Sequence, residues 1–148
     1  MERTHVLTER EVKARVEIKL ETYVKTKEIE YKTAINMART LILPAITKQI
    51  CLTSNAAACM KKANSYSSVL IEESRMFDNL FLRIKEKTND LEDVVGQKFK
   101  DLQQRATHLA DKGEKALEAL RNYVDQAEEV VADEFWPLAK YQDLLTVL

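Results

Sequence analysis

The two histidines are the first candidates for chemistry, because an imidazole ring can bind a metal ion or transfer a proton. Glu2 and His5 have the i, i+3 spacing that carboxylate-bridged di-metal sites use in helical bundles. The second half of such a site would need another carboxylate three residues before His108, but Arg105 stands there. A di-metal site of this kind is therefore incomplete.

An acidic cluster made of Glu128, Glu129, Asp133 and Glu134 is the second candidate, since carboxylates attract divalent cations. Acidic side chains near a helix end are more commonly solvated or paired with lysine. The sequence also lacks a glycine-rich loop that would bind phosphate. We therefore predict no catalytic, cofactor-binding or metal-binding residues in this chain.

Cys51 and Cys59 are the third candidates. On one helix, residues eight positions apart lie roughly 12 Å apart along the axis, which is too far for a disulfide. Neither cysteine lies at an expected helix N-terminus, where a reactive thiolate would be stabilised. We expect both to be buried free thiols.

The composition predicts an all-α fold. Two glycines and two prolines in 148 residues leave few turns, while 45% hydrophobic and 32% charged residues suit long amphipathic helices. We expect one domain, residues 1–148, built as an antiparallel bundle of three long helices with a short C-terminal helix. The expected helices are about 8–62, kinked at Pro44, then 66–111, 114–135 and 137–146.

Charge and hydropathy exclude several classes of partner. With 23 basic and 24 acidic residues, the net charge is −1, and no block of five like charges would attract nucleic acid or an anionic membrane surface. No apolar run approaches the roughly 20 residues that span a bilayer, and the first residues are too polar for a secretory signal. We expect a cytoplasmic protein without nucleic-acid or membrane partners.

The first expected helix has a clear beginning and a long apolar stripe. Thr8 and Glu11 have the spacing of a capping box. Lys27 interrupts the stripe, and Pro44 should kink the helix because proline lacks an amide hydrogen. The stripe residues follow steps of three and four: Val12, Val16, Leu20, Tyr23, Tyr31, Ala34, Ile35, Ala38 and Leu41.

Two glycines should affect the second expected helix, residues 66–111. Gly113 should end it, because glycine readily takes the left-handed conformation of a helix C-cap. Gly96 should weaken it midway, by about 1 kcal/mol relative to alanine. A break at Asn89 and Asp90 is the alternative.

Aromatic residues gather where the third expected helix ends. Proline disfavours the α region for the residue before it, so Trp136 should end that helix and Pro137 should open the short one. Phe135, Trp136 and Tyr141 form a bulky cluster that must be covered. It either closes the end of its own bundle or docks on another domain or subunit, so we take Phe135, Trp136, Pro137, Tyr141 and Pro44 as structural or docking residues.

Both ends of the sequence resemble a known family. Residues 6–24 read VLTEREVKARVEIKLETYV, residues 42–45 read ILPA, and residues 120–145 read LRNYVDQAEEVVADEFWPLAKYQDLL. These segments resemble the closing helical segment of type III glutamine synthetases, whose usual DELWPLPKY stands here as DEFWPLAKY. Phe135 and Ala139 are the departures, and the similarity is faint between Cys51 and Thr107.

The resemblance implies a non-catalytic accessory domain at the C-terminal end of a glutamate–ammonia ligase, serving packing and oligomer assembly. Its partners would be the catalytic domain of that enzyme and neighbouring subunits. The nucleotide, glutamate and metal ligands, and with them ATP and magnesium, would be bound upstream. Two alternatives remain. One is a free-standing helical-bundle or coiled-coil adaptor, which the apolar steps of three and four and the missing site fit equally well. The other is a helical carboxylate metalloenzyme acting alone.

Overall fold

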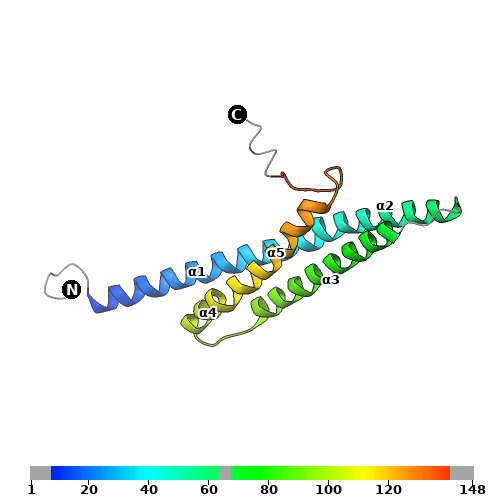
Figure 1. The fold of residues 1–148 in the computed structure, drawn as a ribbon. Helices are drawn as coiled ribbons and strands as arrows, with labels where there is room; N and C mark the ends of the chain where they lie inside the picture. Colours follow the sequence, from blue (N-terminus) through cyan, green and yellow to red (C-terminus); the bar gives the residue numbers. More distant parts are fainter. Residues whose placement is uncertain (1–7, 64–67, 141–148) are drawn as a thin grey trace.

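The computed structural model describes residues 8–63 and 68–140, and within these ranges the chain forms helices and no strand (Figure 1). The all-α prediction is confirmed. The helices form three rods, residues 9–62, 68–96 and 102–130. Their elements are, in order, α1 (Glu9–Met37), η2 (Ala38–Ile42), α2 (Leu43–Lys62), α3 (Ser68–Gly96), α4 (Leu102–His108), η3 (Leu109–Gly113) and α5 (Glu114–Val130).

The capping box predicted at the start of α1 is confirmed. The backbone amide of Glu11 donates to Thr8 Oγ1 at 3.3 Å, and the backbone amide of Thr8 donates to Glu11 Oε2 at 2.7 Å. These bonds satisfy two amides that lack a partner within the helix. The bond from the Thr8 amide, followed by one from the Thr8 hydroxyl, lowers the pKa of the Glu11 carboxyl group.

The first rod passes through Pro44 without a loop. A π-helical turn, η2, directly precedes α2, and the backbone amide of Leu43 donates to Ala38 O, five residues back. Pro44 has no amide hydrogen and its ring crowds the carbonyl four residues before it, so a widened turn accommodates the proline. The kink itself stays a prediction.

The predicted helix 66–111 is wrong, because the rod ends earlier. α3 ends at Gly96, residues 97–101 are irregular, and Asp101 opens α4 as N-cap by accepting from the amide of Gln104 at 3.1 Å. Gly96 has the low helix propensity that permits this end. The alternative break at Asn89 and Asp90 does not occur, since both lie inside α3.

Gly113 does not end a helix, contrary to the prediction. Its φ of −65° and ψ of −46° are right-handed helical, and the rod continues through it into α5. A Cβ atom on Gly113 would lie 2.5 Å from Cε2 of Tyr31, a fully buried ring. Gly113 is therefore required by the close approach of Tyr31 and not by a turn.

Tyr31 also satisfies the backbone of the π-helical turn η3. Its hydroxyl donates to Leu109 O at 2.9 Å, where the widened turn changes the usual backbone pairing. Burial, followed by the negative charge of Glu114, raises the pKa of Tyr31 to about 12. The hydroxyl therefore stays protonated at neutral pH and remains a donor.

Lys27, which interrupts the apolar stripe, is paired across the bundle. Its ammonium group lies 2.6 Å from a carboxylate oxygen of Glu114 and 2.8 Å from one of Glu30. The hydrogen bonds to Glu114 and then Glu30 raise the pKa of Lys27 above its ordinary value. The charge in the stripe thus links α1 to the start of α5.

The helices pack around α3. Figure 1 shows α3 returning beside α2 and α1, and α5 packs on α3, while α1 also contacts α4. The largest fully buried side chains come from all three rods: Tyr31, Ile42, Ile46, Phe77, Ile84, Leu91 and Leu109.

The predicted burial of the two cysteines is wrong. Cys51 and Cys59 are free but exposed, because the buried face of α2 instead carries Ile46, Gln49 and Thr53. The apolar stripe of α1 is also not buried along its whole length. Figure 1 shows the N-terminal half of α1 projecting beyond the other helices. There the stripe residue Val16 is 51% exposed, while Leu20 and Tyr23 pack against the core.

The predicted C-terminal helices also differ. The helix expected at 114–135 ends at Val130, and residues 137–140 of the expected helix 137–146 are not helical. The remainder of that helix lies outside the described residues. Helix α5 ends before residue 135 because the backbone amide of Ala132 donates to the side chain of Gln49 in α2 and not to a helix carbonyl.

Candidate functional site

The C-terminal turn, residues 131–140, is the most distinctive local structure of the chain. Val131 leaves the helix with φ −77° and ψ 135°, and the amides of Phe135 and Trp136 donate to Ala132 O at 2.9 and 3.1 Å. Trp136 is 7% exposed and joins the core beside the end of α5. The turn therefore folds Trp136 back onto the chain's own bundle.

A buried glutamine of α2 holds this turn in place. Gln49 Oε1 accepts from the backbone amide of Ala132 at 3.3 Å, and Gln49 is 7% exposed. Thr53 Oγ1 in turn donates to Gln49 O at 3.1 Å. Sequence reasoning missed Gln49. The only signal was its spacing three residues after Ile46, which places a polar residue on an apolar face.

Lys140 closes the turn. Its ammonium group donates to Val131 O at 3.3 Å and forms an ion pair with Asp133 at 2.5 Å. Asp133 belongs to the acidic cluster considered for metal binding, and here its partner is a lysine. Within residues 8–63 and 68–140, no three His, Cys, Asp or Glu side chains are grouped to hold a metal ion.

The structure brings together some of the predicted docking residues. Phe135 is half-buried and packs against the core that contains Trp136. Pro137 is exposed, and Pro44 is exposed in the first turn of α2. Tyr141 lies outside the described residues. Among the described residues, Nε1 of Trp136 is buried without a hydrogen-bond partner.

An apolar groove adjoins the C-terminal turn. We call it the α1–α5 groove, because one wall comes from α1 and η2 and the other from α5. Its lining includes Ala34, Met37, Ile42, Leu117, Val124 and Leu138. Its volume of about 220 Å³ is below the roughly 300 to 1,000 Å³ of typical small-molecule sites. The groove is thus better matched to side chains than to a cofactor.

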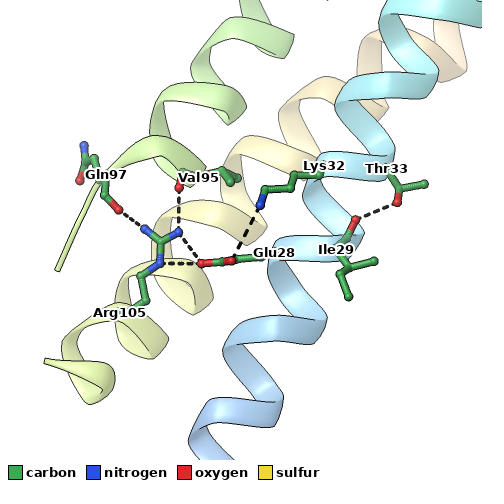
Figure 2. Close-up of polar contacts among 7 residues, drawn as sticks. All are labelled: Glu28, Ile29, Lys32, Thr33, Val95, Gln97 and Arg105. Carbon is green, nitrogen blue, oxygen red and sulfur yellow. Dashed lines mark hydrogen bonds and ion pairs between the residues drawn. The ribbon is translucent and has the colours of Figure 1, made fainter. Parts of the chain in front are cut away.

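A second polar centre surrounds Arg105, as Figure 2 shows. The guanidinium group donates to Glu28 Oε1 of α1 at 2.7 and 3.1 Å, to Val95 O at 2.7 Å and to Gln97 O. The carbonyls belong to the end of α3 and the segment after it. Lys32 Nζ lies 4.0 Å from the other oxygen of Glu28.

Arg105 thus joins α1, the end of α3 and α4. Its planar guanidinium group presents five N–H donors in a rigid fork, a geometry that a lysine ammonium group lacks. Phe99 lies beside it, with the Arg105 Cζ atom 5.9 Å from the ring centroid, and the His108 ring lies 4.7 Å from the Phe99 ring at a tilt of 43°. His108 Nε2 lies 3.2 Å from Val94 O. These groups hold helices together, and no spacing in the sequence pointed to the Arg105 contacts.

The fold and these contacts define a helical bundle domain with an apolar groove and a helix that projects from the bundle. Residues 1–61 match the family model described as the glutamine synthetase C-terminal domain. The chain is also 27% identical over 149 residues to a glutamine synthetase of Bacteroides fragilis (strain YCH46). That alignment covers 95% of this chain and 20% of the relative.

These comparisons confirm the resemblance to the C-terminal domain of a glutamine synthetase. The chain spans about a fifth of the length of the curated relative it matches. Among the described helices, none combines the length and apolar character needed to cross a membrane.

Proposed function

We propose that this chain is the C-terminal helical accessory domain of a type III glutamine synthetase, and that it serves packing and oligomer assembly. Similarity along 95% of the chain supports the family assignment. The projecting half of α1 carries the assembly role. It lies within residues 1–61, the region that matches the family model.

The first half of α1 presents apolar side chains that the described residues leave exposed or only partly covered. Val16 is 51% exposed and Ile18 is 62% exposed, while Val12 and Leu20 are only partly covered. An isolated helix shorter than about 12 to 15 residues is marginally stable in water, so most helices depend on tertiary packing. In a longer protein, the catalytic domain or a neighbouring subunit would supply that packing.

Catalysis belongs elsewhere in this proposal. ATP and magnesium would be bound by upstream residues of the parent enzyme, which would act in the cytoplasm. The net charge of −1 gives neither nucleic acid nor an anionic membrane a reason to bind. The polar centres at Gln49 and Arg105 hold the helices together instead.

Charging the projecting part of α1 should disrupt assembly. In the full-length protein, we expect Val16→Glu to dissociate the oligomer, because a carboxylate would be buried in an apolar interface. Lys19→Glu is the matched control, since it places the same residue one turn away at an exposed polar position. Size-exclusion chromatography with light scattering measures the result.

The two variants should melt at the same temperature as the unmodified chain when the domain is studied alone, because neither residue is buried in it. An oligomer that tolerates Val16→Glu as well as Lys19→Glu would contradict the assembly role. That outcome would favour the free-standing adaptor.

The isolated chain should not form glutamine from glutamate, ammonia, ATP and magnesium. The expectation follows from the polar side chains at Arg105 and Gln49, which bond to another side chain, to a backbone carbonyl and to a backbone amide among the described residues. A coupled ATP-hydrolysis assay and direct measurement of glutamine test it, with the full-length enzyme as positive control. Turnover above background in protein free of full-length enzyme would contradict the accessory role.

A further inference from the structure

The α1–α5 groove is an apolar surface left open between two helices that both pack on α3. Leu117 and Val124 form one wall and Ala34 and Met37 the other, and all four are only partly buried. Leaving such side chains in contact with water costs free energy, which burial by apolar groups would recover. A segment with apolar side chains at helical spacing would fit this groove.

The segment that follows the C-terminal turn has this pattern. Residues 141–148 read YQDLLTVL, so Tyr141, Leu144, Leu145 and Leu148 fall at i, i+3, i+4 and i+7 on one helical face. The groove is lined in part by Leu138, three residues before this segment begins. An eight-residue helix is roughly 12 Å long, so no long connection is needed.

The groove and residues 141–148 also carry complementary charges. Arg121 is the one charged residue among the described lining residues, and Asp143 is the one charged side chain of residues 141–148. Arg121 is 78% exposed and lies 3.8 Å from Asp125, which leaves most of its guanidinium group accessible. An acidic side chain entering at this edge would meet an opposite charge.

We propose that residues 141–148 bind in the α1–α5 groove of the same chain as a short amphipathic helix. Tyr141, Leu144 and Leu145 fill the space between α1 and α5. The segment then covers the apolar walls and adds a further contact between the first and third rods, which already meet at Lys27 and Glu114 and, just past the end of the third rod, at Gln49 and Ala132. The proposal does not depend on the enzyme family.

Cysteine crosslinking of the full chain tests the location of the segment. In a Cys51→Ser, Cys59→Ser background, the pair Val124→Cys with Leu145→Cys should give a several-fold excess of crosslink within one chain over a control pair. The control joins Leu145→Cys to Leu82→Cys, an exposed α3 position outside the groove. Ala34→Cys, on the opposite wall, provides a second groove pair if Val124→Cys disturbs the fold. Non-reducing electrophoresis separates products within a chain from products between chains.

Three results would overturn the proposal. Crosslinks formed only between chains would assign the groove to a second copy. Equal yields from groove and control pairs would show that the segment has no preferred position. No crosslink from either groove pair in folded protein would show that the segment lies elsewhere and leaves the groove to another partner.

Discussion

Trp136→Ala should lower the free energy of unfolding of this chain by about 3 to 5 kcal/mol, the usual cost of truncating a buried tryptophan. The ring is 7% exposed and lies in the core with Ala127 and Val131, so its loss leaves a cavity at the end of α5. For a chain of this size, the melting temperature should fall by roughly 10 °C. Thermal unfolding followed by circular dichroism measures the change.

Trp136→Phe is the matched control, because it keeps an aromatic ring and removes only the indole N–H and part of the volume. Since Nε1 has no hydrogen-bond partner among the described residues, this variant should lose much less stability than alanine. If Trp136→Ala left the melting temperature unchanged but reduced the oligomer size of the full-length protein, the ring would dock on another subunit. An effect on neither quantity would contradict both roles.

Features that depend on neighbouring residues were predictable from the sequence. The capping box at Thr8 and Glu11 needs only two side chains three positions apart, and it forms as expected. The scarcity of glycine and proline likewise predicted helices throughout. Pro44 was expected to disturb a helix without opening a loop, and the chain does pass through it helically.

The C-terminal turn depends on a contact that the sequence does not reveal. Ala132 and Gln49 lie 83 residues apart, and their hydrogen bond withdraws the Ala132 amide from the helix. The apolar spacing of α5 continues toward Trp136, so a local reading extends the helix to residue 135. A tertiary bond overrides that preference and turns the chain at Val131 instead.

The exposed half of α1 illustrates a different limit. The steps of three and four from Val12 to Tyr23 correctly indicate which face of the helix is apolar. They do not indicate whether a partner covers that face. Whether the apolar face is covered depends on where the other rods end. Helix α3 ends at Gly96, whereas we expected that helix to continue to residue 111.

The two glycines show the same limit at single residues. Each interrupts a helical pattern, and local propensity cannot distinguish them. Gly96 ends α3 in open space, whereas Gly113 lies inside a rod against Tyr31. The difference comes from a ring far away in the sequence, since Tyr31 and its acceptor Leu109 are 78 residues apart.

Gly113→Ala should therefore destabilise the chain, although glycine to alanine inside a helix ordinarily stabilises by up to about 1 kcal/mol. The new Cβ would lie 2.5 Å from Cε2 of Tyr31 and 2.9 Å from its hydroxyl oxygen, and the buried ring has little room to move. Overpacking typically costs about 1 to 3 kcal/mol, and moving the ring would also weaken its bond to Leu109 O. We expect a net loss of about 1 to 3 kcal/mol in denaturant unfolding.

Gly96→Ala is the matched control with the opposite sign. Nothing lies within 4 Å of its added Cβ, so the substitution should raise stability by a few tenths to about 1 kcal/mol. A double-mutant cycle with Tyr31→Leu then isolates the contact, because a smaller side chain relieves the clash. In that background Gly113→Ala should lose most of its cost, while Gly96→Ala should keep its gain. If Gly113→Ala were equally damaging with leucine at position 31, the requirement for glycine would lie in the backbone of η3 and not in the tyrosine ring.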